Sequence, residues 1–157
     1  MIHRAILIST GPSPDSVRGK VVRMAGEFSI RLEDTPVHLG LGASVIPQPP
    51  FTGTPDWYQS YAERNAADGS EGRLVTLHAF TDPWDSWEVH PYGEELVVCI
   101  EGSITLHQEV DGRVRTVPLE KGEAVVNPPG VWHTADVTGS ATALFVTAGL
   151  RTEIRPR

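Results

Sequence analysis

From Arg73 onward, short runs of β-branched and apolar residues alternate with turn residues, and this alternation limits the fold more than any other feature. Runs of five to eight residues with this composition are typical of strands, and several at close spacing indicate an all-β barrel or sandwich. Asp111-Gly112 lies between two alternating runs and is the best hairpin signal. The expected strands are RLVTLHAF, ELVVCI, SITLHQEV, RVRTVPL, EAVVN and TALFVTA, with DPWDS, EG, DG, KG and PPG among the turns.

One short helix is predicted before these strands. Thr54 suits the N-cap, Pro55 the first helical position and Asp56 the positive end of the helix dipole. Gly69 is expected to end the helix after roughly three turns.

The chain is expected to form one domain, because 157 residues with 39% apolar and 21% charged side chains suit a single core. Residues 1–72 would hold N-terminal strands, a connector and the helix, residues 73–150 the core barrel, and residues 151–157 a tail. Residues 20–33 could supply one or two strands. Residues 45–55, VIPQPPFTGTP, are expected to be the connector, since proline lacks the amide donor that a central strand needs.

Bulk composition excludes several classes of function. The formal net charge of −7, without a cluster of Lys or Arg, argues against a nucleic-acid partner. No window of the sequence approaches the roughly 20 apolar residues of a membrane span, and the N-terminal run AILI is too short for a signal-peptide core. We therefore expect a soluble cytoplasmic protein with no membrane partner.

The run LVVCI, residues 96–100, is apolar at every position, so both of its faces must be covered. One face would meet the barrel interior. The other would meet a second subunit or an N-terminal arm laid across the barrel, and a homodimer is therefore expected. Cys99 within this run is expected to be a small buried hydrophobe.

Ligand-type side chains gather just before this run. Positions i and i+2 of a strand face the same way, so Glu88 and His90 would project together. The sequence PYGE then turns the chain, and Glu95 opens the next strand. If the two strands pair, Glu95 can face the same cavity as Glu88 and His90.

This segment resembles the first motif of the cupin superfamily: His-x-His, three or four spacers, a Glu, six residues and a Gly. Glu88-Val89-His90, four spacers, Glu95, six residues and Gly102 fit this frame, except that Glu88 takes the place of the first His. The Gly that usually opens the motif is Asp82 here.

The second cupin motif is a Gly, five residues, Pro-x-Gly, two residues and a His, and GEAVVNPPGVWH (Gly122 to His133) is similar to it at each of these positions. The usual closing Asn is Val137. Apart from the family, Gly102 and Gly122 lie at strand junctions where positive φ is often needed, and Pro129-Gly130 can aim His133 inward. The resemblance implies a cupin-type double-stranded β-helix, a jelly-roll barrel, with a metal site formed by Glu88, His90, Glu95 and His133.

Two Glu and two His suit one divalent Fe, Mn, Ni or Zn ion. Because two carboxylates neutralise the ion, it would be a weaker Lewis acid than with three His and one Glu. Alternatively, Glu88 stands off the metal as a catalytic general base, and the ion rests on the other three ligands in a set that resembles the triad of iron(II) oxygenases. A solvated Glu88 is a third alternative.

Trp84, Trp87, Tyr92 and Trp132 flank the ligand positions. They could line the pocket mouth, or plug a core or an interface. His78 could reach the cavity from the preceding strand, or be a satisfied core or surface histidine. The helix residues Trp57 and Tyr58 are expected to be packing anchors.

The resemblance implies a metal-dependent enzyme that acts on a small organic molecule. Oxygenation is preferred because the site offers open coordination positions, and isomerisation, cyclisation or lyase chemistry with Glu88 as base follows closely. The alternative is a non-catalytic cupin that binds a small ligand and has a structural metal or none. A third hypothesis is a structural subunit whose two-sided strand serves assembly.

Overall fold

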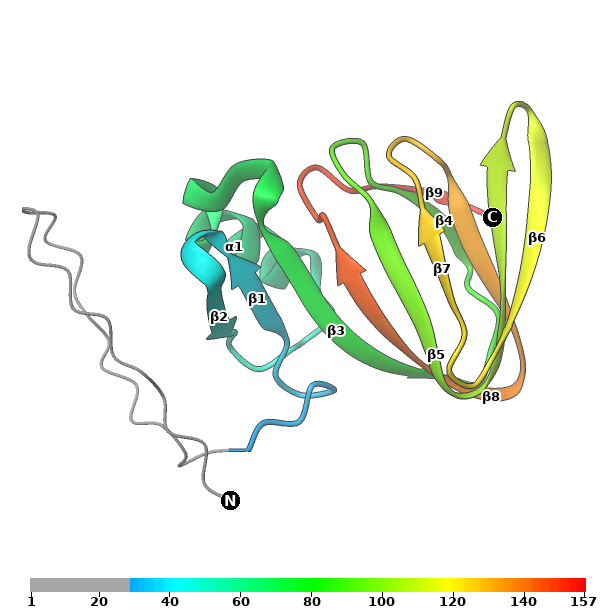
Figure 1. Ribbon diagram of the computed structural model, residues 1–157, viewed down its shortest axis with the longest axis horizontal. Coiled ribbons are helices and arrows are strands. Elements are labelled where there is room, and N and C mark those ends of the chain that lie inside the picture. The colour runs from blue at the N-terminus through cyan, green and yellow to red at the C-terminus, as the bar shows by residue number, and fades with distance from the viewer. Residues whose placement is uncertain (1–28) are drawn as a thin grey trace, which may run out of the picture.

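The computed structural model describes residues 29–157, and these residues form one nine-stranded antiparallel sheet folded into two facing layers (Figure 1). Two long strands, β5 (Glu95–Val110) and β8 (His133–Thr147), run through both layers. The first layer has the order β2-β1-β3-β8-β5-β7, and the second β9-β4-β8-β5-β6. The other strands are β1 (Val37–Gly40), β2 (Ser44–Pro47), β3 (Arg73–Phe80), β4 (Ser86–Val89), β6 (Arg113–Glu120), β7 (Ala124–Asn127) and β9 (Glu153–Pro156).

The core lies between the layers, as expected for the predicted all-β jelly-roll barrel, which the structure confirms. Alternate residues of β5 and β8 point inward, so apolar side chains from both strands meet and exclude water. The buried cluster consists of Val97, Cys99, Ile104, Leu106, Leu119, Ala135, Val137, Ala141, Ala143 and Phe145.

The separation predicted between ELVVCI and SITLHQEV is wrong, because both runs belong to the single strand β5. The chain bends at this point, and no turn divides it into two strands. Its register against β8 shifts between Cys99 and Glu101 and again between Gly102 and Ile104, as a bulge does. Gly102 has φ 71°, and a Cβ there would lie 2.1 Å from the Ser140 carbonyl oxygen, so this corner accepts only glycine without rearrangement.

The predicted hairpin is confirmed. Asp111 and Gly112 have φ of 51° and 72° and join β5 to β6, which matches a two-residue turn with two positive φ angles. Positive φ is also found at Gly122, as the sequence indicated.

The predicted helix start is confirmed, and the predicted end is wrong. Helix α1 (Pro55–Arg64) begins after Thr54, whose hydroxyl accepts a hydrogen bond from the Trp57 amide. It ends at the C-cap Asn65, whose φ of −109° and ψ of 12° leave the helical range and whose side-chain nitrogen donates to the Tyr61 carbonyl. Gly69 lies further on, in the 3-10 helix η2 (Ala66–Glu71).

Three other expectations for the chain ends are corrected. The connector begins at Gln48, because residues 45–47 belong to β2, an edge strand where Pro47 is tolerated. The tail contains β9, which pairs with β4. Residues 29–33 form no strand and enter a turn, and residues 20–28 of the predicted strands lie outside the described residues. A short 3-10 helix, η1 (Leu41–Ala43), joins β1 to β2.

Candidate metal centre

The four predicted ligands lie close together in the structure. Glu88 lies on β4, His90 directly after it, Glu95 at the start of β5 and His133 at the start of β8. The pairing of β4 with β8 places Glu88 opposite His133. One ligand atom from each of Glu88, His90 and His133 lies within 4.8 Å of the others. Glu88 is therefore a partly buried member of a cluster and not a solvated surface carboxylate.

Glu95 lies between the two imidazoles. Its Oε1 is 3.3 Å from His90 Nε2, and its Oε2 is 3.1 Å from His133 Nε2. His90, Glu95 and His133 are all buried. All four predicted ligands thus line one site.

The imidazole orientations leave both Nε2 atoms facing this site. His133 Nδ1 donates to the Val131 carbonyl at 3.1 Å, which leaves the Nε2 lone pair free in the neutral ring. His90 Nδ1 lies 2.9 Å from the Thr152 hydroxyl. Despite their closeness to Glu95, the two Nε2 atoms are buried with no well-aligned hydrogen-bond partner among residues 29–157. Metal-binding histidines are typically held in this way through the other ring nitrogen.

Buried polar side chains fix the Glu95 carboxylate. Thr147 donates to Oε1 at 2.6 Å, and Asn127 donates to Oε2 at 3.0 Å. Gln108 donates in turn to the Asn127 side-chain oxygen at 2.7 Å. Glu95 is paired with Thr147 on one side and Asn127 on the other, so the register of β5 with β8 and β7 builds this network.

The site favours positive charge. Burial alone would raise the pKa of Glu95, but His133 and His90 outweigh it and hold that pKa well below its usual range. Burial would lower the pKa of His133, and the Glu95 carboxylate beside it reverses the effect and raises it. Burial, followed by the charge of Glu95, raises the pKa of Glu88.

These features fit a divalent metal ion. Two buried imidazole lone pairs and two carboxylates converge, and a cation satisfies groups whose burial without a partner would cost free energy. Nitrogen and oxygen donors of this kind suit Fe, Mn, Ni or Zn.

A cavity of about 950 Å³ opens beside the cluster and is large enough for a small organic molecule. Glu88, His90 and Glu95 line it. Two of the predicted pocket residues, Trp84 and His78, also line it, on an aromatic wall shared with Phe80 and Phe145. Burial lowers the pKa of His78, as expected for a packed histidine.

The other three predicted pocket residues lie outside this cavity. Trp87 and Trp132 neighbour Glu88 and His133 in sequence, but both contact the Arg155 guanidinium and neither lines the cavity. For Trp87, alternation along β4 turns the side chain to the face opposite Glu88. Tyr92 lies on the turn before β5 and is exposed.

Some residues that line the cavity were not predicted from the sequence, because they come from elements other than those of the two motifs. Tyr58 of α1 packs edge-on against Phe51 and Trp57 and also lines the cavity. Burial, with smaller effects of Glu88 and Glu95, raises the pKa of Tyr58 to about 12. Arg151 and Thr152 line the cavity from the connection between β8 and β9. No sequence signal linked these positions to the ligands.

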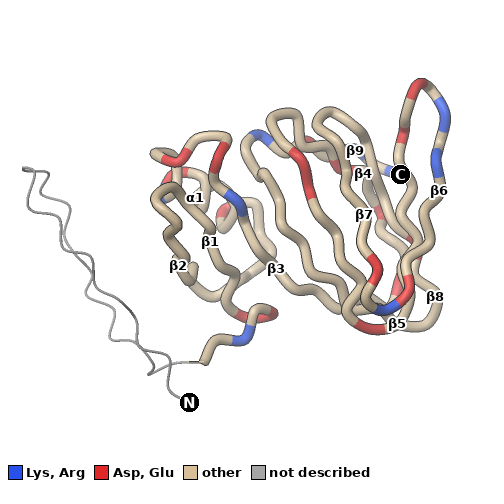
Figure 2. The backbone as a smooth tube through the Cα atoms, in the orientation of Figure 1, with Lys and Arg blue, Asp and Glu red and all other residues tan. Residues whose placement is uncertain are grey.

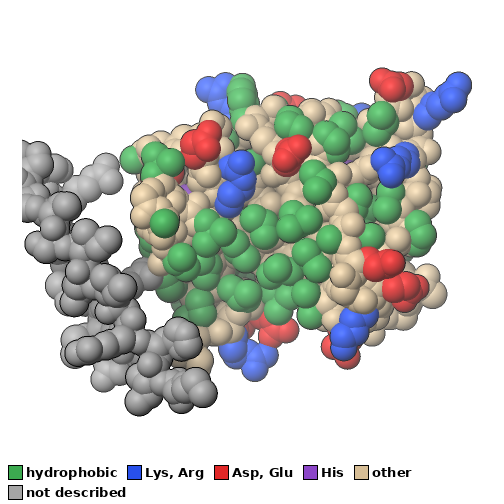
Figure 3. Space-filling view, in the orientation of Figure 1, with side chains coloured by type: hydrophobic (Ala, Val, Ile, Leu, Met, Phe, Trp, Pro, Cys, Tyr) green, Lys and Arg blue, Asp and Glu red, His purple; other side chains and the backbone are tan. Residues whose placement is uncertain are grey.

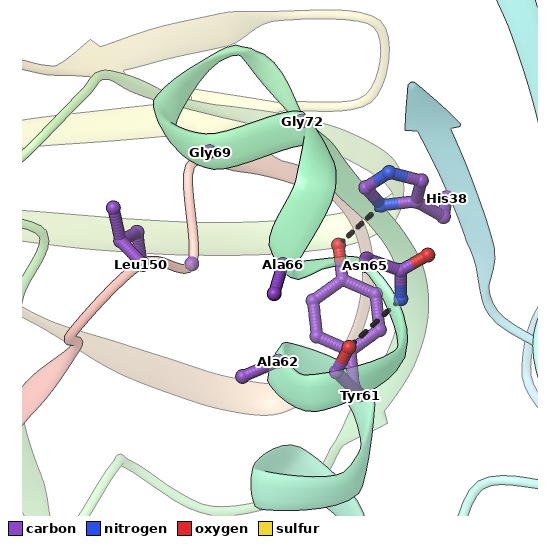
Figure 4. Close-up of a pocket in the computed structure, with 9 residues that line it drawn as sticks. His38, Tyr61, Ala62, Asn65, Ala66, Gly69, Gly72 and Leu150 are labelled. Carbon is purple, nitrogen blue, oxygen red and sulfur yellow. Dashed lines mark hydrogen bonds between the residues drawn. The ribbon is translucent and has the colours of Figure 1, made fainter. Parts of the chain in front are cut away.

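A second, smaller cavity of about 40 Å³ lies beside the first and is lined by His38, Tyr61 and Leu150 among others (Figure 4). It has room for about one water molecule. The Tyr61 hydroxyl points to His38 Nδ1 at 2.7 Å (Figure 4). On the other side of the ring, His38 Nε2 lies 2.8 Å from Asp68. Because both ring nitrogens of His38 are satisfied, this cluster joins α1 and η2 to β1 and is not a second ligand site.

One family model agrees with the fold. Residues 74–149 match the family model described as cupin domain. A cupin-2 domain containing protein from Shewanella frigidimarina is 21% identical, with 54% of this chain and 71% of that chain covered and a TM-score of 0.41. Hydroxypropylphosphonic acid epoxidase from S. wedmorenis is 17% identical (48% and 43% covered, TM-score 0.42). Hydroquinone 1,2-dioxygenase from Sphingomonas sp. TTNP3 is 16% identical (48% and 59% covered, TM-score 0.40). No curated protein matches the chain.

Proposed function

This chain belongs to the cupin superfamily through its cupin domain at residues 74–149, and on that premise we propose that it is a metal-dependent enzyme acting on a small organic molecule. The observation that carries the proposal is the pair of buried Nε2 atoms, on His90 and His133, that face two carboxylates at the wall of an open cavity. Oxygenation is the preferred reaction. Two imidazoles and a carboxylate leave coordination positions open, as in the triad of iron(II) oxygenases.

When bound, a divalent ion would supply Lewis acidity and positions for substrate and oxygen. His90, His133 and Glu95 would hold it, and Thr152, Val131, Thr147 and Asn127 keep those three side chains in place. The aromatic wall of Phe80, Trp84 and Phe145 would exclude water from a bound substrate.

Glu88 has two roles open to it. It can complete the ligand set, since it lies with His90 and His133 in the cluster. It can also accept a proton from a substrate held beside it, which would favour isomerase, cyclase or lyase chemistry. Glu88→Gln separates these roles: loss of metal identifies a ligand, and loss of turnover with full metal content identifies a base.

Within the described residues, no helix is long and apolar enough to span a membrane. We extend the proposal to a cytoplasmic location, supported by the lone and fully buried Cys99.

Elemental analysis of protein purified without a His-tag tests metal binding. We expect close to one divalent ion per chain in the wild type and its loss in His90→Ala and His133→Ala. His107→Ala is the matched control, because His107 binds Asp136 and Thr116 and is not among the cavity residues. Equal metal content in all four proteins would contradict the proposal.

Nitric oxide added to iron(II)-loaded protein separates an enzyme from the alternative, a small-ligand-binding cupin with a structural metal. An open coordination position gives a new absorption band and electron-spin signal. A spectrum that does not change would favour the non-catalytic binding protein.

A further inference from the structure

Arg151 is the only Lys or Arg among the described residues that line the main cavity. It lies on the connection between β8 and β9, next to Thr152, whose hydroxyl holds His90. A guanidinium is therefore placed one residue from a group that orients a metal ligand.

The Arg151 guanidinium has no carboxylate partner among residues 29–157. Its Nη1 lies 3.4 Å from the Tyr92 hydroxyl, and its Cζ lies 5.7 Å from the centre of the Tyr92 ring. By contrast, Arg155 on the following strand, β9, pairs with Glu109, and Arg157 just after that strand pairs with Asp136. Tyr92 steadies Arg151 and leaves most of its donors available to an anion.

The backbone at Arg151 is strained. Its φ is 55°, in the left-handed region that disfavours side chains with a Cβ. Strain of this kind is concentrated at functional sites, where a side chain is kept at a cost in stability. Asparagine tolerates this conformation better than arginine does.

We propose that Arg151 binds the anionic end of the substrate, an organic acid carrying a carboxylate or phosphonate group. This inference rests on the proposed function. The guanidinium fork would take two oxygens of the anion, and the apolar body would lie against Phe80, Trp84 and Phe145. Asp82 and Asp85 line the cavity from the connection between β3 and β4 and would repel the anion, which leaves the Arg151 side for it.

Calorimetric titration of zinc-loaded protein with phenylacetate, phenylphosphonate and the neutral phenylacetamide tests this assignment. The wild type should bind at least one of the acids more tightly than the amide, and the preferred acid distinguishes the two anion classes. Arg151→Asn should weaken binding of the acids tenfold or more and leave the amide unchanged. Its melting temperature should stay equal or rise, because the strain is relieved.

Arg115→Asn is the matched control, since it removes the same charge from an exposed position on β6. Acid binding that is equal in the wild type and Arg151→Asn, or no preference for either acid over the amide, overturns the inference. Zinc content is measured in the same samples. A wild type that holds no zinc contradicts the proposed function instead, so the two failures are distinguishable.

A different observation carries a second inference, on the outer face of the first layer. Hydrophobic side chains gather over β3, β5 and β7 in Figure 3, and few charges lie there in Figure 2. Strand pairing aligns them in rows across four strands. This apolar face consists of Val75, Val146, Leu96 and Val126 in one row and Leu77, Leu144, Val98 and Ala124 in the next.

The apolar face is open to solvent in the described chain. Val126 is 47% exposed, and Ile100 at the end of the LVVCI run is 41% exposed. Contiguous apolar surface of this kind marks an interaction site, because hydrating it costs free energy that association recovers. The sequence predicts that both faces of the LVVCI run are covered, but residues 29–72 do not cover Ile100.

We infer that a second copy of this chain covers the apolar face, with a two-fold axis along β8. Arg73 on β3 and Glu94 before β5 lie one row beyond Val75 and Leu96, on either side of β8. The axis exchanges β3 with β5, so Arg73 would face Glu94 of the partner subunit twice. Neither charge has an ion-pair partner within residues 29–157, and such complementarity favours a second copy over an uncharged cover.

Light scattering during size-exclusion chromatography of the full chain tests this interface. The wild type should be a dimer and Val98→Lys a monomer. Val114→Lys should remain a dimer, because Val114 is an equally small apolar residue, 55% exposed, on β6. Circular dichroism checks that the variants fold.

Charge reversal provides a test that leaves the apolar face intact. Arg73→Glu should weaken the dimer, and combining it with Glu94→Arg should restore it. A monomeric wild type, or a dimer that survives both Val98→Lys and Arg73→Glu, overturns the inference. A monomeric wild type would favour residues 1–28 as the cover.

Discussion

The two faces of the β3-β8-β5-β7 layer differ in a way that reverses the usual composition of a sheet. Toward the interior, β5 presents Glu95 between Thr147 and Asn127. Toward the outside, the next row is wholly apolar, with Leu96 at its centre. A sheet with one solvated face normally places apolar residues inside and polar residues outside. The inner row carries the buried carboxylate for which we propose a cation, and the outer row belongs to the apolar face for which we propose a second copy.

The second half of β5 shows that the reversal is local. Beyond the bulge at residues 99–104, Ile104 and Leu106 point inward, and Thr105 and His107 point outward, in the usual arrangement. One strand therefore serves two purposes. Both halves contribute to the core, through Val97 and Cys99 before the bulge and Ile104 and Leu106 after it, and the first half also carries the candidate ligand Glu95 and the apolar outer row.

The largest effect is expected from removing the inward carboxylate. In metal-free protein, Glu95→Ala would leave the buried donors of Asn127 and Thr147 unpaired and remove the charge that both histidines face, so we expect a loss of about 4 kcal/mol in the free energy of unfolding. Leu96→Ala, one residue along and half-buried on the outer face, should cost only about 1 kcal/mol. Urea unfolding with a chelator measures both. Equal losses would mean that Glu95 is not held as the geometry indicates.

The next largest effect is expected at Gly102, in the bend between the two halves of β5. Gly102→Ala adds a Cβ 2.1 Å from the Ser140 carbonyl oxygen at positive φ, and we expect it to cost about 3 kcal/mol. Gly112→Ala has the same φ problem with open space around it and should cost about 1 kcal/mol. Thermal unfolding of the two variants compares them. A similar loss of stability in both variants would show that the backbone around Gly102 rearranges to accept a Cβ, so that this residue does not determine the bend in β5.

Most strands of the barrel and the candidate metal ligands could be predicted from the sequence, because each depends on a short local pattern. Six apolar runs marked β3, β5, β6, β7 and β8, and two glycine-framed motifs marked His90, Glu95 and His133. Asn127 and Thr147 could not be assigned to Glu95, because only strand register brings residues 32 and 52 positions away into hydrogen bonds with it.

Other misses have different physical causes. Trp87 was placed in the pocket from its closeness in sequence to Glu88, although adjacent strand residues face opposite ways. Arg151 was missed because residues 151–157 have no apolar pattern and were read as a tail, and only pairing with β4 holds them beside the site. The bulge in β5 was missed because its glycine also suits a turn.

The smallest effect is expected on the outer face of the second layer, which is polar in the usual way. Asp136 there lies 2.8 Å from His107 Nε2 and 2.6 Å from Arg157, and hydrogen bonds from His107 and then Arg157 lower its pKa. Because the folded-state pKa lies below the unfolded-state value, the carboxylate contributes stability above the unfolded-state value. This contribution is lost as the pH falls through the folded-state value.

Asp136→Asn should therefore lower the melting temperature slightly at pH 7, and the difference from the wild type should vanish in acid, where the wild-type carboxyl is protonated as well. The effect is small because the pair is open to solvent and screened by salt, so high salt should shrink it further. Melting curves measured from acid to neutral pH check the sign. A difference in melting temperature that stays constant with pH would mean that Asp136 stabilises the fold through its shape and hydrogen bonds and not through its charge. The charge of Glu95 on the inner face would then be the only one of the two carboxylate charges that affects stability.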